Sequence, residues 1–538
     1  MLRELVQTMN AGLTAESKTK LRANLEALQG ACDLEFLWAS LCSGTDLVSV
    51  VLSHLFEFWE KTFGLSFNVT QEFACENVPM KQRWLDTVME VRHIFPEVEK
   101  MNARLIQDIR GVDVTVRKVL CAFAGVECDS ISACNRNRSE NWQCVLEDLY
   151  GDESSKTGTT ARACLGYVKV HRPAVFLLEN VRNLSVKANN NKSNLQLIVE
   201  VLNSMGYHVC YDCLNSLRHG VPQSRERFLL LSVLVSDRAL DQLDEDYVHP
   251  DWAQDLDHVI AQTAMPALPL QRFLLPDDDA EVRLANAPEV PPMKKGLKSA
   301  RRKEGEAAAD VEKRKADDKV SEFEVNHLAA FNEAGIAWPP VFTDEFKEKC
   351  GRLPERERQV LYYDEAVQGS AAKLRDLHAR DLHMTIEWGV SKKGYVPTIT
   401  SSSQIWVRGS FCDTNAETRV VDRLLCGSEL LALQGLPPDA WRTSELPGFS
   451  QKDLADMAGN AFCAGHLIPV LVAAMTCVPW QEAIRLSHSA LQTDEDIRAG
   501  TALEQQDEGS EDEGSEDEAG SHVTHGSRVS RASDDDWS

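Results

Sequence analysis

Two stretches place reactive side chains directly after short apolar runs. Residues 119–124 predict a buried strand, and the polar loop that follows carries Cys128. A second apolar run, residues 174–178, leads into Glu179 and Asn180. Ligands of open α/β sheets bind beyond the carboxyl ends of the strands, so a thiol and a carboxylate can face one crevice there. The pair is either a nucleophile with a proton-handling carboxylate or a structural cysteine beside an unrelated acid.

Five segments extend this pattern along the chain. In order they are AGVECDSISACNRNR (124–138), FLLENVRNL (176–184), HGVPQSRERFLLL (219–231), RLLCGSELLALQGLP (423–437) and MAGNAFCAGHLIPVL (457–471). Together they resemble the motifs of the cytosine-5 methyltransferases, including the Pro-Cys loop, the Glu-Asn-Val segment and the Gln-x-Arg-x-Arg segment. The resemblance implies a Rossmann-like, S-adenosylmethionine-dependent α/β fold with a mostly parallel sheet and an inserted, smaller target-recognition domain.

The same resemblance implies a role for each catalytic residue. Cys128 would add to carbon 6 of a flipped-out cytosine, so that carbon 5 can accept a methyl group. Glu179 would hydrogen-bond ring nitrogen 3 and the exocyclic amine. Arg227 would hold the ring carbonyl, Arg225 would support the loop or a phosphate, and Asn180 would orient the catalytic loop.

The first strand, turn and helix of the fold are expected from residue 34 onward, with Ser43, Gly44 and Thr45 in the turn. The family has Phe-x-Gly-x-Gly at this place, and it binds S-adenosylmethionine there. Here Cys42 replaces the Phe and Asp46 replaces the second Gly, so we expect a less close approach to the ligand. An ordinary strand-to-helix turn is the alternative.

Further cofactor contacts are expected downstream. Glu76 closes the second strand, where an acid suits the ribose hydroxyls. The resemblance implies that Asp108 accepts a hydrogen bond from the adenine amino group and that Ile109 lies beside the ring. Asn77 and Asn460 complete the expected set. On spacing alone, Asp108 could equally be a turn residue.

The catalytic loop departs from the family pattern at two positions. Glu127 and Asp129 stand where the family has Pro and Gln. Two carboxylates beside Cys128 should raise the pKa of its thiol. Two rivals to DNA methylation therefore remain: a tRNA cytosine-5 methyltransferase, whose Cys-Phe-Thr signature is not found here, and a catalytically silent scaffold that binds chromatin or nucleic acid.

Composition and charge bear on the cellular compartment and on how the chain could bind nucleic acid. The 538 residues carry a formal charge of −26, of which residues 494–538 contribute −12 through 15 Asp or Glu against three Arg. Scattered cysteines and a polar start predict a reducing compartment, and no stretch is expected to span a membrane. The basic clusters 294–303 and 313–315 are either a signal for nuclear import, as the expected nuclear localisation requires, or part of a solvated linker. The tail is a candidate for binding chromatin partners. Nucleic acid must then bind through local basic surface, for which Arg408 is one candidate and a plain edge strand the alternative.

Composition also divides the chain into five parts. We expect an N-terminal helical extension (1–30), a catalytic domain (31–240), a recognition region (241–418) with a flexible basic linker (276–322), a return to the catalytic domain (419–490) and a disordered acidic tail (491–538). Residues 457–475 are expected to form one helix that Asn460 opens. Cys210 and Cys213 lack a second pair, so no metal site is expected. The oligomeric state is not predicted.

Overall fold

The structure is a computed structural model of the whole chain. It describes residues 1–31, 35–133, 135, 142, 145–146, 156–187, 192–240, 251–287, 322–350, 353–386, 392–413, 417–441 and 448–489. The acidic tail and most of the basic linker, for which the sequence predicts disorder, lie outside these residues. So does the middle of the segment that follows Cys128.

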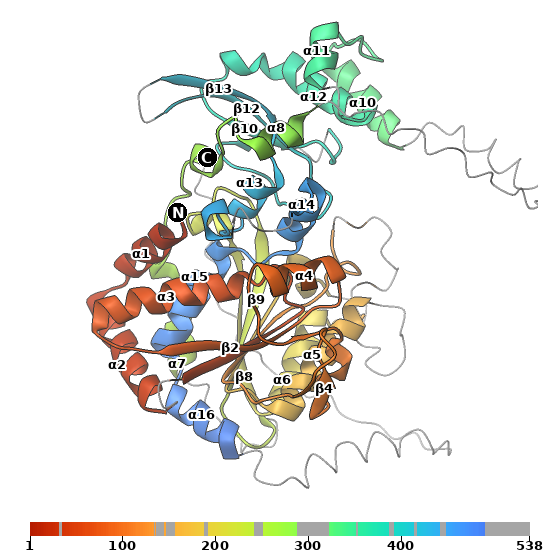
Figure 1. Cartoon of the computed structure of the whole chain (residues 1–538). Helices are drawn as coiled ribbons and strands as arrows, with labels where there is room; N and C mark the ends of the chain where they lie inside the picture. The colour runs from red at the N-terminus through yellow and green to blue at the C-terminus, as the bar shows by residue number, and fades with distance from the viewer. Residues whose placement is uncertain are drawn as a thin grey trace, which may run out of the picture.

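The larger lobe is built on a seven-stranded sheet with the order β3-β2-β1-β6-β7-β9-β8 (Figure 1). All pairs are parallel except those that β9 makes with β7 and β8. This is the expected α/β fold with a mostly parallel sheet. The strands are β1 (Glu35–Leu41), β2 (Asn68–Cys75), β3 (Ile94–Phe95), β6 (Cys121–Gly125), β7 (Val175–Val181), β8 (Tyr207–Asn215) and β9 (Glu226–Leu234).

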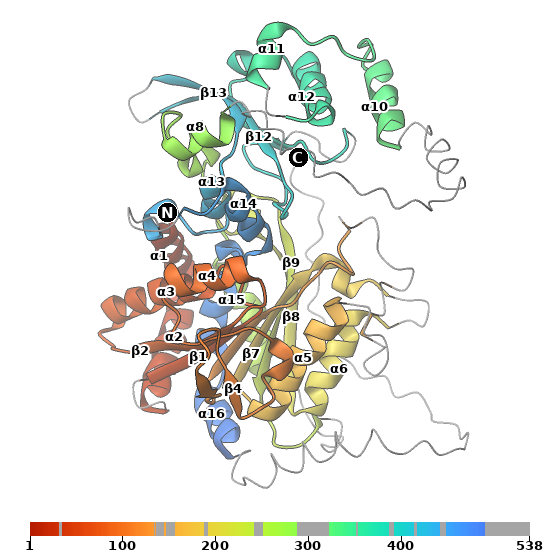
Figure 2. The ribbon, with the colours of Figure 1, turned by 45° about the vertical axis from the view of Figure 1, so that its right-hand side comes forward.

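Helices cover both faces of this sheet, which explains why the central strands are almost continuously apolar (Figures 1 and 2). One face packs on α1 (Leu2–Gly12), α2 (Ala15–Ala31), α3 (Leu47–Phe63), α7 (Asp251–Gln262), α15 (Ala464–Cys477) and α16 (Trp480–Ser489). The other face packs on α5 (Lys156–His171) and α6 (Asn194–Ser204). The predicted N-terminal helices are confirmed, and Leu5 and Met9 of α1 are fully buried.

The smaller lobe contains an antiparallel sheet with the order β11-β10-β12-β13. Its strands are β10 (His378–Asp381), β11 (Lys392–Lys393), β12 (Ile405–Cys412) and β13 (Thr418–Leu424). The helices α10 (Glu322–Glu333), α11 (Asp344–Lys349) and α12 (Glu355–Gln368) share a separate apolar core around Phe331 and Trp406. Figures 1 and 2 show this lobe above the carboxyl-end region of the larger sheet.

The boundaries between the lobes differ from those expected. Helix α7 packs against α15, so the larger lobe continues past residue 240. Helix α8 (Ala280–Asn286) occupies part of the range predicted as a linker, because Val282 and Ala285 bury their side chains against Cys426. Strand β13 pairs with β12, so the chain leaves the smaller lobe only after Leu424 rather than at residue 419.

The described part of the return segment contains the helices α13 (Gly427–Ala432), α14 (Gln451–Asn460), α15 and α16. Asn460 therefore ends a helix instead of opening one. By length and composition alone, residues Gln451–Cys477 could cross a membrane, with a mean hydropathy of 1.6. The sequence expectation of no such stretch was therefore wrong. However, 94% of its most apolar window is buried inside the protein, as in a core helix.

Two smaller elements complete the edge of the larger sheet. Helix α4 (Pro79–Thr87) follows β2, and a two-stranded hairpin is formed by β4 (Leu105–Gln107) and β5 (Asp113–Thr115). Trp84 of α4 is fully buried between α3 and the rings of Trp441 and Phe449. Through the Thr45 contact, Trp84 holds α4 against the turn that follows β1.

Candidate active site and cofactor turn

Cys128 lies in a tight turn three residues beyond β6. Its carbonyl oxygen accepts the amide N–H groups of Ile131 at 3.1 Å and Ser132 at 2.8 Å. The side chain is half-buried, and burial raises the pKa of the thiol. Arg227 and Arg225 oppose this rise, whereas Glu179 and then Asp129 add to it. The raised pKa agrees with the expectation, but burial rather than a neighbouring carboxylate is its main cause.

Glu179 and Arg227 meet beside this turn because of strand register. Glu179 of β7 lies opposite Gly125, the last residue of β6, while Arg227 at the start of antiparallel β9 lies opposite Val181. Arg227 Nε and Glu179 Oε1 form an ion pair of 3.0 Å, with 11% and 12% of the two side chains exposed. Strand β7 continues through Glu179, so the carboxylate is held by sheet backbone rather than by a loop.

Asn180 ties the strand to the catalytic loop. Its side-chain amide donates to the carbonyl of Val126 at 3.3 Å, two residues before Cys128. The carbonyl oxygen of the Asn180 side chain, Oδ1, accepts the amide N–H of Val181 at 2.7 Å. The side chain is 2% exposed. This geometry suits the predicted role of orienting the loop.

Arg225 connects the two lobes, a role that the Gln-x-Arg-x-Arg segment did not predict. Its guanidinium, 2% exposed, donates to the carbonyl oxygens of Ile399 at 3.0 Å, Gly459 at 3.4 Å and Ala461 at 2.8 Å. Burial lowers the pKa of this arginine to about 10. The side chain thus joins the segment between β11 and β12 of the smaller lobe to the end of α14 and the loop that follows it. The predicted phosphate contact is incompatible with this burial, whereas support of the surrounding loops fits it.

Two neighbours of Arg225 reinforce this junction. Gln223 is fully buried, donates to the carbonyl of Leu433 at 3.4 Å and bridges to Val396 of the smaller lobe. A Cβ atom at Gly459 would lie 2.1 Å from the amide nitrogen of Ser401, so only glycine fits there. Sequence analysis gave neither residue this role; for Gln223, the signal was its place in the Gln-x-Arg-x-Arg segment.

The cofactor turn is fastened to the end of β2. Ser43 donates its amide to Cys75 O at 3.0 Å, and its hydroxyl accepts the Cys75 amide at 3.2 Å. Gly44 has φ of +58° and donates its N–H to Glu76 Oε2 at 3.0 Å. The carbonyl of Thr45 accepts the indole N–H of Trp84 at 3.1 Å. Glu76 therefore lies against the turn, and its contact with the ribose stays a prediction.

Asp46 keeps the backbone of a glycine while adding a carboxyl group. Its φ is +54°, in the left-handed region where Asp is one of the better tolerated residues. The side chain is 1% exposed, and one carboxyl oxygen accepts a hydrogen bond from Gln71 of β2. The other oxygen, Oδ1, has no hydrogen-bond partner. Burial raises the pKa of Asp46 to about 7.

The remaining cofactor candidates lie around the same crevice. Asp108 accepts the amides of Arg110 at 2.9 Å and Val112 at 3.0 Å, and these bonds outweigh burial and lower its pKa. Its carboxylate is therefore both a turn-forming group and an acceptor. Ile109 is partly buried on the main core. The carbonyl of Asn460 lies 3.4 Å from the Cβ position of Gly44, which brings the last motif to the first.

Two further candidates remain, Asn77 and Arg408. Asn77 is exposed, and its side chain makes no hydrogen bond with the part of the chain that the structure describes. Arg408, proposed for phosphate contact, is 1% exposed and donates to the carbonyl of Gly369 inside the smaller lobe, so that expectation was wrong. No group of three or more metal-ligating side chains occurs among the described residues.

The geometry can now be set beside known proteins. The family profile described as C-5 cytosine-specific DNA methylase matches residues 151–473, which is more than half of the chain. The chain therefore belongs to this family, whose methyl donor is S-adenosylmethionine.

Individual relatives agree with this assignment. The chain is 25% identical over 460 residues to DNA (cytosine-5-)-methyltransferase DMT5 of Cryptococcus neoformans, covering 81% of this chain and 17% of that protein. It is 31% identical over 132 residues to the type II methyltransferase M.Bsp6I of a Bacillus species, covering 24% and 38%. The chain thus spans well under two thirds of either relative. A putative DNA modification methyltransferase from an Escherichia coli prophage superposes with a TM-score of 0.41 at 15% identity, covering 82% of this chain and 99% of that one.

The crevice residues fit S-adenosylmethionine. Glu76 and Asp108 present carboxylate oxygens at the ends of β2 and β4, where they can accept hydrogen bonds from a nucleoside. Gly44 leaves the turn open on the side of Asn460. Asp46 adds an unpartnered carboxylate oxygen to the same turn. These residues would hold the cofactor between the turn after β1 and the hairpin β4–β5.

Proposed function

We propose that this chain transfers the methyl group of S-adenosylmethionine to carbon 5 of cytosine in DNA through a covalent cysteine adduct. The observation that supports it best is the meeting of Cys128, Glu179 and Arg227 at the ends of three neighbouring strands. Bound S-adenosylmethionine supplies an activated methyl group. The chain must supply a nucleophile, a hydrogen-bonding partner for the ring and a place for a flipped base.

The residues divide this work. The sulfur of Cys128 would bond to carbon 6, and the electron pair of the 5,6 double bond would move toward carbon 5. Glu179 would hydrogen-bond ring nitrogen 3 and the exocyclic amine, stabilising the charge that develops on the ring. Arg227, paired with Glu179, would hold the ring carbonyl. Loss of the carbon 5 proton to a base would then expel the Cys128 thiolate from carbon 6 and restore the 5,6 double bond. Asn180 would keep the loop in place through Val126.

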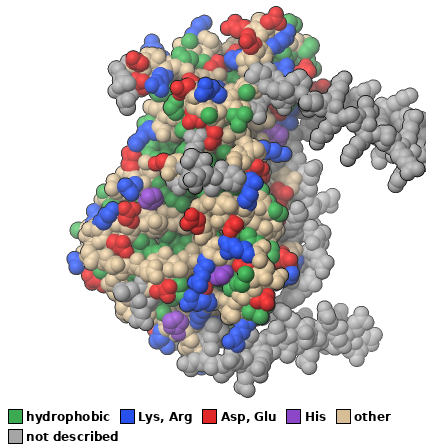
Figure 3. Space-filling view, viewed as in Figure 1, with side chains coloured by type: hydrophobic (Ala, Val, Ile, Leu, Met, Phe, Trp, Pro, Cys, Tyr) green, Lys and Arg blue, Asp and Glu red, His purple; other side chains and the backbone are tan. Residues whose placement is uncertain are grey.

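Charge is mixed on the face of the molecule shown in Figure 3. On the face shown in Figure 3, Lys and Arg side chains alternate with Asp and Glu, so this face presents no continuous basic track. Phosphate affinity requires local basic surface. We therefore propose that the nucleic acid enters between the two lobes, whose relative position Arg225 and Gln223 fix.

The setting follows from the same proposal. A DNA methyltransferase acts where the DNA is, so we propose a nuclear, epigenetic role, with chromatin partners recruited by the acidic residues 494–538. One observation favours the silent-scaffold alternative: the raised pKa of the Cys128 thiol leaves less reactive thiolate at neutral pH.

The deciding experiment uses the full chain with methyl-labelled S-adenosylmethionine and, in parallel, duplex DNA and tRNA. Label in carbon 5 of DNA cytosine supports the proposal. Label only in tRNA assigns the chain to RNA. Label in neither, with nucleic acid still bound, supports the scaffold.

A further inference from the structure

Strand β2 leaves part of one sheet edge without a neighbouring strand. It pairs with β1 along one side, but on its other side β3 pairs only with Ala74 and Cys75. Within the described part of the chain, residues 68–71 therefore have no strand partner on that side. Asn68 is exposed, and residues 69–71 are half-buried. Proteins often protect such an edge with Lys or Pro, and the sequence NVTQ of residues 68–71 contains neither, so the edge is open to an added strand.

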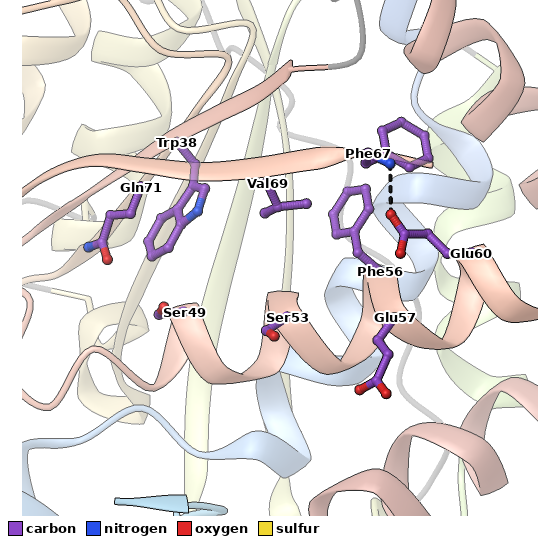
Figure 4. Close-up of a pocket in the computed structure, with 9 residues that line it drawn as sticks. All are labelled: Trp38, Ser49, Ser53, Phe56, Glu57, Glu60, Phe67, Val69 and Gln71. Carbon is purple, nitrogen blue, oxygen red and sulfur yellow. Dashed lines mark hydrogen bonds between the residues drawn. The ribbon is translucent and has the colours of Figure 1, made fainter. Parts of the chain in front are cut away.

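A pocket of about 370 Å³ lies beside this edge, between α3 and strands β1 and β2 (Figure 4). Val69 and Gln71 of β2 line one wall, Ser49 and Ser53 of α3 line the opposite wall, and Trp38 of β1 lies between them. From residue 67 to residue 71 the strand wall runs for about 13 Å, which is the length of four or five extended residues. The pocket can therefore receive side chains from an extended chain that lies along β2.

One end of the pocket carries a carboxylate that is held in place and has no countercharge. Oε1 of Glu60 accepts the amide N–H of Phe67 at 2.7 Å, which fixes the carboxylate between α3 and the start of β2 (Figure 4). No cation among the described residues pairs with Glu60. Glu57, one turn earlier on α3, instead pairs with Lys61 at 2.6 Å and with Arg3 at 3.5 Å. The Glu57 carboxylate points away from the strands, so Glu60 is the acid available inside the pocket.

The chemistry of this end suits a Lys or Arg side chain. The rings of Phe56 and Phe67, with centroids 5.0 Å apart, form an apolar surface beside the Glu60 carboxylate. A Lys or Arg side chain can lay its apolar stem on such a surface and keep its charged head at the polar rim. The head would then make a charge-assisted hydrogen bond to Glu60. The formal charge of −26 on the chain also favours a basic partner over an acidic one.

We propose that the β2 edge and this pocket together form a docking site for an extended peptide of a partner protein. The peptide adds to residues 68–71 as a new strand and places one Lys or Arg side chain against Glu60. Backbone hydrogen bonds at the edge provide affinity, and alternate side chains of the added strand enter the pocket and provide specificity. The site lies at the amino-terminal half of β2, whereas the cofactor crevice begins beyond Cys75 at its carboxyl end, so the two sites are separate.

The test measures fluorescence anisotropy of a labelled peptide, Thr-Val-Thr-Lys-Thr-Val-Thr, with blocked ends, on the full chain. Replacing its Lys by Glu should weaken binding by about tenfold or more. Two further versions carry N-methyl groups on one or the other alternating set of backbone amides. Only one edge of the peptide pairs with β2, so one version should lose binding and the other should keep it. Equal binding of all versions would overturn the proposal.

Two variants of the chain separate the pocket carboxylate from general surface charge. Glu60→Gln keeps an acceptor for the N–H of Phe67 but removes the charge, so it should weaken the Lys peptide by about tenfold and should not weaken the Glu peptide. Glu57→Gln, three residues earlier on the same helix, is the matched control and should bind both peptides as the wild type does. Equal losses in the two variants would refute the role of Glu60. Thermal unfolding checks that both variants are folded.

Other occupants of the site give different results. Self-association of the chain that the Lys peptide disrupts, seen by sedimentation, would assign the edge to a second copy and overturn the proposal. Tighter peptide binding after the basic residues within 294–303 are changed to neutral ones would assign the site to the chain's own basic cluster, with the same consequence. All these measurements report binding alone, so the docking site can fail or stand separately from the proposed methylation.

Discussion

The loop around Cys128 and the turn around Gly44 both carry acids where the family has neutral residues. In the loop, Asp129 is exposed, and it is the weakest of the named influences on the pKa of Cys128. In the turn, Asp46 is buried, and its own pKa rises to about 7. The same kind of replacement thus changes little where water screens the charge and much where it does not.

A related contrast separates the two arginines of the Gln-x-Arg-x-Arg segment. Arg227 pairs with a carboxylate beside the catalytic loop, whereas Arg225 donates only to backbone carbonyls that join the lobes. Residues two apart share one face of a regular strand. Arg225 lies before the first residue of β9, so it does not have to share a face with Arg227.

The largest expected effect concerns the nucleophile. Cys128→Ser should reduce covalent capture of an oligonucleotide containing 5-fluorocytosine to background, because a hydroxyl is a far weaker nucleophile than a thiolate. Denaturing electrophoresis of the protein–DNA adduct measures it. Cys213→Ser, a half-buried cysteine on β8, is the control and should trap normally. Trapping by the Cys128 variant would place the nucleophile elsewhere.

The second largest effect is expected from a change at the junction between the lobes. Arg225→Lys should lower the free energy of unfolding by about 4 kcal/mol, since one ammonium group cannot reach three carbonyl groups and some stay buried without a donor. Urea unfolding measures this loss. Arg182→Lys, whose guanidinium is mostly exposed in its pair with Glu226, should cost little. A similar loss of unfolding free energy in both variants would show that Arg225 does not join the two lobes.

Asp46→Asn should stabilise the protein in a pH-dependent way. The folded pKa of about 7 exceeds the unfolded value of 3.8, so wild-type stability falls as pH rises between these values and is constant above. The variant lacks this loss and should be more stable by about 4 kcal/mol at about pH 8, and about equal near pH 4. Urea unfolding at both pH values is the measurement. A constant difference would mean that Asp46 does not titrate in this range.

The smallest effect is expected at Asp129. Asp129→Asn should raise the methylation rate at neutral pH less than tenfold, which corresponds to less than about one pKa unit for the thiol. Burial, which the substitution leaves unchanged, is the main cause of the raised pKa of Cys128. A pH–rate profile gives the shift of the alkaline rise. A larger shift would make the neighbouring charge, and not burial, the dominant influence.

The sequence by itself indicated the first strand, turn and helix of the larger lobe, the strands before Cys128 and Glu179, and the position of Glu76 after β2. Local signals suffice for this: apolar runs mark buried strands, and parallel strands bring their carboxyl ends to one edge. The turn at Gly44 was also predictable, including the acid at Asp46.

Only the tertiary structure decided where the polar side chains point. Arg225 meets carbonyls 174 and 236 residues away, and Arg408 is enclosed by a segment 39 residues earlier, so no local pattern could show that either is buried. The same holds for Asp46, whose pKa depends on β1 and β2 closing over it. Burial sets the energy of a charge, and burial is a property of packing between distant segments rather than of sequence spacing.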